Sequence, residues 1–165
     1  DDWLPHYNVF WGIQQIYKHR EIWLTYGTAM EASSHRRLDF KIPDVHEARA
    51  RPWGSTHLQT FKAFLFRAIN KRDLMDGDDA FWQVSGDMAF MLPMLEMAGN
   101  TRVEWCSEVD YVYNDLNPLC DFKQRHAEQL AAERAIRSLP SYVLLNRQSA
   151  PVEPGPPAAE DQVGQ

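Results

Sequence analysis

Apolar residues recur along the chain at two different spacings, one typical of helices and the other of strands. The three- and four-residue spacing of a helix face predicts helices at residues 9–20, 61–69, 88–98 and 122–137. Short runs rich in β-branched and aromatic residues predict strands at residues 22–26 and 109–113. Because helices separate the strands, the pattern favours an α/β domain, in which ligands bind at loops that follow the carboxyl ends of strands.

Two segments depart from this pattern. Residues 30–54 are polar, basic and interrupted by proline, which predicts a long surface excursion. Residues 147–165 hold four of the ten prolines and few large apolar side chains, so they cannot bury enough surface to offset the entropy of ordering. We therefore expect one domain at residues 1–146, followed by a disordered proline-rich tail at 147–165.

Composition excludes several classes of function. The 165 residues carry 17 Lys and Arg against 23 Asp and Glu, a net charge of −6, whereas nucleic-acid binders usually need excess basic residues to neutralise phosphates. No apolar run reaches the length of a transmembrane helix. Two cysteines, Cys106 and Cys120, make neither a disulfide framework nor a tetrahedral metal site. We expect a cytoplasmic protein without a transmembrane segment that does not bind nucleic acid.

Carboxylates at three places are candidates for chemistry. Asp1 and Asp2 repel each other, so they suit a divalent cation such as Mg²⁺ or Mn²⁺, but they also suit the start of the following helix as an N-cap pair. Asp87 precedes an apolar helix face, where it is either the N-cap or a general base. A further hypothesis is a hydrolase that pairs Asp87 with Asp110. The distance that such a pair of carboxylates requires cannot be read from the sequence.

An aromatic loop residue and a histidine are candidates for substrate binding. Trp53 lies beside a glycine in a polar loop, where its ring either stacks on a sugar or anchors the loop to the core. His57 follows four residues later, and a lone histidine is more often a structural hydrogen-bonding residue than a base. The residues themselves leave both alternatives open.

Five segments in a fixed order carry a family resemblance. They are D-D-W-L at residues 1–4, W-L-T-Y-G-T at 23–28, T-H-L-Q-T-F-K at 56–62, G-D-M-A-F with P-M-L-E-M-A-G at 86–99, and Y-V-Y-N-D-L-N-P at 111–118. Together they resemble a bacterial subgroup of the family-2 glycosyltransferases, which have the A-type glycosyltransferase fold. The resemblance implies the second half of a Rossmann-like domain, with a mixed sheet flanked by helices. It also implies that the first Asp of the D-x-D signature precedes Asp1.

The resemblance also implies a reaction and roles for residues. It implies inverting transfer of a sugar from a nucleotide-sugar donor, UDP- or GDP-linked, to an acceptor hydroxyl of a glycan or another molecule, with Mn²⁺ or Mg²⁺. Asp1 and Asp2 would hold the metal, and Asp87 would be the general base. Acceptor binding would involve Trp53 and His57, and the donor phosphates would lie near two asparagines of the last motif, Asn114 and Asn117.

A second hypothesis keeps the same surface without the reaction. A truncated relative could retain an aromatic acceptor cleft and serve as a non-catalytic module that binds glycans or a protein partner. Loss of glycan binding in Trp53→Ala, without any effect of metal, would distinguish this module from the enzyme.

Overall fold

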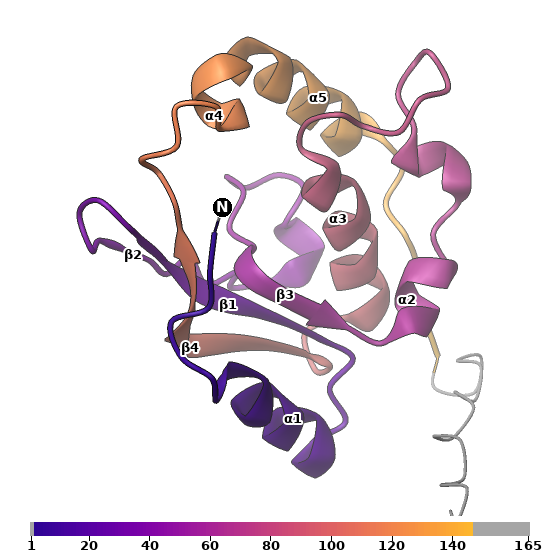
Figure 1. The fold of residues 1–165 in the computed structure, drawn as a ribbon. Coiled ribbons are helices and arrows are strands. Elements are labelled where there is room, and N and C mark those ends of the chain that lie inside the picture. The colour runs from indigo at the N-terminus through magenta and orange to yellow at the C-terminus, as the bar shows by residue number, and fades with distance from the viewer. Residues whose placement is uncertain (1, 147–165) are drawn as a thin grey trace, which may run out of the picture.

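The structure is a computed structural model that describes residues 2–146. Asp1, predicted as a metal ligand, and the tail predicted at residues 147–165 lie outside the described residues. Within residues 2–146 the chain forms an α/β domain with an open mixed sheet flanked by helices, as the alternation of helical and extended patterns predicts (Figure 1).

Strand β1 (Leu24–Glu31) is the centre of the sheet because it pairs along both edges. Along one edge lie two antiparallel partners, β3 (Thr56–Phe61) and the short β2 (Arg37–Leu38). Along the other edge lies the parallel strand β4 (Val103–Tyr113). Near the end of β4, Trp3 forms an antiparallel bridge with Val112, which brings the N-terminal segment to this end of the sheet.

Helices cover both faces of the sheet, and the larger core lies on one of them. Helix α3 (Gly86–Ala98), with α2 (Ala63–Arg67) and α5 (His126–Ser138), lies on the opposite side of the sheet from α1 (Val9–His19) (Figure 1). Ten of the thirteen residues of α3 are buried, since the helix is apolar on every side. Leu24 and Tyr26 of β1 belong to this core, while the intervening Thr25 hydrogen-bonds with Thr60 of β3.

The structure corrects three predicted elements. Residues 56–61 form strand β3, so the helix predicted at 61–69 shortens to α2. The helix predicted at 122–137 is broken at Arg125, whose φ of −130° is not helical, into α4 (Asp121–Gln124) and α5. Within the excursion predicted at 30–54, a 3₁₀ turn, η1 (Val45–Glu47), carries Val45 into the core, so this segment is not wholly at the surface.

A close backbone approach explains how β3 lies against the central strand. A Cβ atom at Gly27 would lie 2.7 Å from the backbone nitrogen of Leu58, closer than side chains tolerate. The absence of a side chain therefore lets β3 lie directly against β1, and the hydrogen bonds of the sheet decide the structure of residues 56–61.

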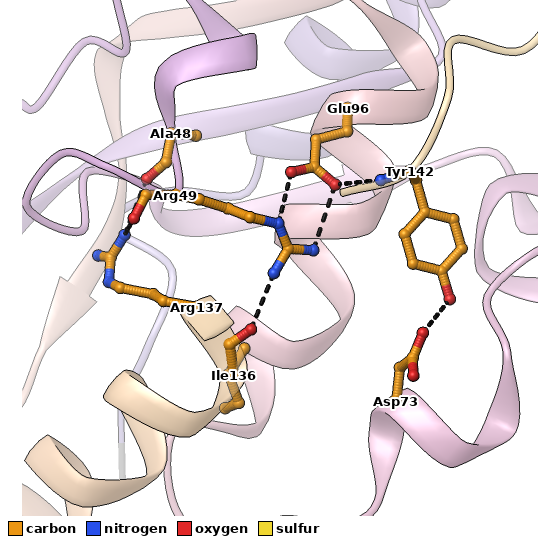
Figure 2. Close-up of polar contacts among 7 residues, drawn as sticks. All are labelled: Ala48, Arg49, Asp73, Glu96, Ile136, Arg137 and Tyr142. Carbon is orange, nitrogen blue, oxygen red and sulfur yellow. Dashed lines mark hydrogen bonds and ion pairs between the residues drawn. The ribbon is translucent and has the colours of Figure 1, made fainter. Parts of the chain in front are cut away.

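A buried polar network joins α3 to α5 and to the segment after η1 (Figure 2). Arg49 donates to Glu96 of α3 from Nε and Nη2, at 2.5 and 3.2 Å, and to the carbonyl of Ile136 in α5 at 2.8 Å. Glu96 is only 2% exposed, and its Oε2 also accepts the backbone N–H of Tyr142 at 2.8 Å. In return, Arg137 of α5 donates to the carbonyls of Ala48 and Arg49. Together these contacts hold α5 at a fixed position beside α3.

Candidate functional site

A cavity of about 580 Å³ opens at the N-terminal end of α3, between this helix, the loop before β3 and the α4–α5 segment. Three residues predicted from the sequence line it, namely Trp53, His57 and Asp87. They come from separate parts of the chain, and only the tertiary structure brings them together. The cavity is also lined by residues that the sequence analysis did not select, among them Trp82, Asp121, Phe122, His126 and Gln129.

Asp87 lies in the first turn of α3 and is not its N-cap. The N-cap position is Ser85, which has a left-handed φ of 55° and makes no capping hydrogen bond through its side chain. Oδ2 of Asp87 accepts a hydrogen bond from Nε1 of Trp53 at 3.3 Å, whereas Oδ1 makes no hydrogen bond with any residue in the range 2–146. The positive end of the helix dipole favours a carboxylate at this position. The capping hypothesis is therefore wrong, and a carboxylate oxygen is left for another partner.

Trp53 packs against the core as a loop anchor and also lines the cavity, while its stacking on a sugar stays a prediction. Its ring is half-buried and packs against the main core, and it also lines the cavity. Its indole nitrogen donates to Asp87, so the ring cannot turn without breaking that hydrogen bond. Trp53 thus anchors its loop and at the same time fixes the orientation of the Asp87 carboxylate.

His57 is linked to the N-terminal segment through Tyr111 of β4. The rings of His57 and Tyr111 are stacked, with centroids 4.9 Å apart and planes inclined by 26°. The hydroxyl of Tyr111 donates to Oδ2 of Asp2 at 2.6 Å. Burial, followed by this hydrogen bond and the charge of Asp2, raises the pKa of Tyr111, which keeps the hydroxyl a donor. The sequence analysis includes Tyr111 in a predicted strand and in the segment at residues 111–118 but assigns it no role at the site.

Asp2 and Asn114 meet at the end of β4. Oδ1 of Asp2 accepts the backbone N–H of Asn114 at 2.8 Å. Helix α1 begins at Val9 with Asn8 at its N-cap position, so the prediction that Asp2 belongs to an N-cap pair is wrong. Asn117 is part of the following turn, where its Oδ1 accepts the N–H of Leu119 at 2.9 Å.

The described residues do not by themselves provide a metal site near Asp2. No group of three or more His, Cys, Asp or Glu side chains that could hold a metal ion occurs among residues 2–146. Asp2 is a single carboxylate whose two oxygens already accept hydrogen bonds from Tyr111 and Asn114. Hard divalent cations usually require several oxygen ligands, so a metal ion bound at Asp2 would need further ligands besides this carboxylate.

Asp110 belongs to a different cavity from Asp87. It lines a space of about 480 Å³ between α1 and β4, together with Trp11 and Trp105. The side chain is 6% exposed, and its Oδ1 has no hydrogen-bond partner in the described part of the chain. Burial, with a smaller contribution from the charge of Glu108, raises the pKa of Asp110 to about 7. Because the two carboxylates line separate cavities, the geometry does not support the paired-carboxylate hydrolase.

The walls of the Asp87 cavity are fixed by Arg137, one of the residues in Figure 2. Glu133 of α5 lines the cavity and accepts from Arg137 at 2.9 and 2.8 Å, and Arg137 in turn holds the backbone at Ala48 and Arg49. The ion pair of Glu133 and Arg137 confirms the interaction that their four-residue spacing predicts. The helical spacing of apolar residues at 122–137 therefore predicted the helix that forms this wall. It did not predict which part of the molecule the helix packs against.

Two broader properties complete the description. In the described range, 2–146, none of the helices combines the length and the apolar character needed to cross a membrane. No protein-family model, no curated protein and no solved structure matches the chain.

Proposed function

We propose that the chain carries the acceptor side of an inverting glycosyltransferase that uses a nucleotide-sugar donor. The observation that supports this proposal most is the meeting of Asp87, Trp53 and His57 around one cavity. The resemblance assigns these three residues to one function without reference to their positions in space, and Trp53 and Asp87 lie 34 positions apart along the chain. The hydrogen bond between Asn114 and Asp2 brings these residues together at the end of β4, which supports the proposal of a donor-phosphate region there.

In the proposed reaction, Asp87 accepts the proton of the acceptor hydroxyl. The hydroxyl oxygen attacks the anomeric carbon of the donor sugar, and the bond from this carbon to the nucleoside diphosphate breaks with its electron pair. Inversion follows from attack opposite the leaving group. Oδ1 of Asp87 is the oxygen that receives the proton, because Oδ2 is held by Trp53. General-base catalysis of this kind contributes typically about 10²–10⁴-fold to a rate.

Aromatic rings would position the acceptor. Trp53, Trp82 and Phe122 line the cavity, and rings of this kind can lie against the C–H faces of a sugar. Metal dependence, with Mg²⁺ or Mn²⁺ bound by Asp1 and Asp2, remains a prediction that belongs to the donor side. The A-type glycosyltransferase relationship is likewise part of the proposal.

The proposal is tested by sugar transfer with matched variants of Asp87. Radiolabelled UDP- and GDP-sugars would be incubated with the protein, a panel of glycan acceptors and Mn²⁺. Asp87→Asn keeps the size and an oxygen that can accept from Trp53 but removes the base, so transfer should fall by about 10²–10⁴-fold while acceptor binding persists. Asp78→Asn, an exposed aspartate in the turn before Ala80, is the matched control and should retain the parental rate.

Parental transfer by Asp87→Asn would show that this carboxylate is not the base. If the unaltered protein transfers no sugar but binds glycans saturably, the binding-module hypothesis gains support instead. The aromatic lining favours that alternative specifically, because rings alone suffice to bind a sugar. In that case Trp53→Ala should abolish binding, and removal of metal with EDTA should leave binding unchanged.

A further inference from the structure

The charged side chains around the Asp87 cavity are mainly carboxylates. Asp87, Asp121 and Glu133 line it, and neither lysine nor arginine is among the lining residues that the structure describes. The charge of Glu133 is compensated, because Arg137 donates to it from two nitrogens. Among the ion pairs found in residues 2–146, none involves Asp87 or Asp121. Asp87 and Asp121 therefore make no ion pair within residues 2–146, although the charge of Arg125 interacts with that of Asp121.

The remaining polar groups of the described lining add no lysine or arginine side chain, and the partly positive N-terminal end of α3 already has the Asp87 carboxylate in its first turn. The basic groups are two imidazoles, His57 and His126, and each packs against an aromatic ring. His126 lies edge-on to Phe122, with ring centroids 4.9 Å apart. The indole rings of Trp53 and Trp82 have negative faces, which attract cations and repel anions.

We infer that the cavity takes a sugar acceptor that is uncharged or carries an amine, and that it rejects acceptors with a carboxylate, sulfate or phosphate inside the cavity. This inference rests on the proposed function, because it names the substrate class of the same site. The reason is electrostatic: an anionic group would approach two carboxylates that make no ion pair, and none of the lining side chains in the described range is a guanidinium or an ammonium group. An amine, in contrast, would meet both carboxylates and aromatic faces.

Three methyl glycosides test the inference directly, because the second differs from the first only at C2 and the third differs from the first only at C6. Methyl β-glucoside is neutral, methyl β-glucosaminide carries an amine, and methyl β-glucuronide carries a carboxylate. Binding of each to the full chain would be measured by ligand-observed and protein-observed NMR titration at about 0.01 M salt, where charges act over roughly 30 Å. We expect the glucuronide to bind at least about tenfold more weakly than the glucoside, and the glucosaminide to bind at least as tightly as the glucoside.

An aspartate outside the proposed catalytic machinery identifies the origin of this selectivity. Asp121 lies in the first turn of α4 and is exposed, so Asp121→Asn removes one charge without removing the proposed base. The variant should narrow the difference in affinity between the glucuronide and the glucoside several-fold. Asp78→Asn removes a charge of the same kind from the turn before Ala80. It should leave the difference in affinity between glucuronide and glucoside unchanged.

The outcomes separate this inference from the proposed function. If the glucuronide binds as tightly as the glucoside, the inference is overturned while the sugar site stands. If Asp121→Asn and Asp78→Asn change the difference in affinity between glucuronide and glucoside equally, the net charge of the protein rather than the cavity sets this difference. The inference is then again overturned. Failure of all three glycosides to bind, with the chain folded by its NMR spectrum, would count against the proposed function and the inference together.

Discussion

Asp110 makes the stability of the fold depend on pH. Its carboxyl group is 6% exposed, with Oδ1 unpartnered among residues 2–146, so folding removes it from water without replacing its hydrogen bonds. Burial and the nearby charge of Glu108 raise its pKa from 3.8 to about 7. The folded protein therefore prefers the neutral acid over a wide range of pH in which the unfolded chain carries the carboxylate.

The sign and size of the effect follow from this difference in pKa. Because the folded pKa lies above the unfolded one, the favourable contribution is complete below about pH 4 and is lost as pH rises through 7. Each pKa unit corresponds to about 1.4 kcal/mol, so the loss in the free energy of unfolding reaches at most about 4 kcal/mol. Asp110→Asn has no titrating group at this position, so its stability relative to the parent should rise by up to this amount between about pH 4 and pH 8.

Urea denaturation followed by tryptophan fluorescence would measure this difference, since the chain has six Trp. Comparing variant with parent at each pH cancels the titration of all other groups. Asp78→Asn, which removes an exposed carboxyl group, is the matched control. Glu108→Gln should move the Asp110 transition to lower pH, because it removes the second cause of the raised pKa. A stability difference for Asp110→Asn that does not change with pH would refute the reasoning.

Three further predictions concern the contacts that shape the sheet and the cavity. Glu96→Gln leaves the guanidinium of Arg49 buried without its ion pair and should lower the free energy of unfolding by about 3–5 kcal/mol, measured by urea denaturation; a loss below about 1 kcal/mol would contradict a buried pair. Tyr111→Phe keeps the ring stacked on the neighbouring imidazole but removes the hydrogen bond to Asp2, so the histidine NMR signals should persist while stability falls by about 1 kcal/mol; loss of those signals would show that the hydroxyl holds the stack. Gly27→Ala places a methyl group 2.7 Å from the backbone of β3 and should cost more than about 1 kcal/mol, whereas Gly77→Ala, in open space, should be nearly neutral by the same assay; equal costs would contradict the close approach.

Much of the fold could be predicted from local patterns because those patterns coincide with burial. The apolar repeat at residues 88–98 predicted α3 and its end at Gly99, whose φ of 68° suits a residue without a side chain. The run at 22–26 predicted the central strand, whose first six residues are all buried. In these segments the local preference and the tertiary environment favour the same structure.

The incorrect predictions of secondary structure and burial have a common physical cause, namely that a partner distant in the sequence decided the local structure. Strand β3 formed at residues 56–61 because β1 offers it a backbone edge at Gly27. Val45 is buried because η1 packs on α3, which no pattern within the polar segment 30–54 indicates. Pairing across such distances in the sequence leaves little trace in local periodicity.

The sequence by itself determined the chemistry of the candidate side chains: a carboxylate at the start of an apolar helix, a tryptophan in a polar loop and a nearby histidine. Only the tertiary structure decided that these three line one cavity, that Trp53 holds one oxygen of Asp87, and that Asp110 lies elsewhere. The physical reason is that side-chain chemistry is a local property, whereas distance, burial and the balance of charge arise only when separate segments pack against each other.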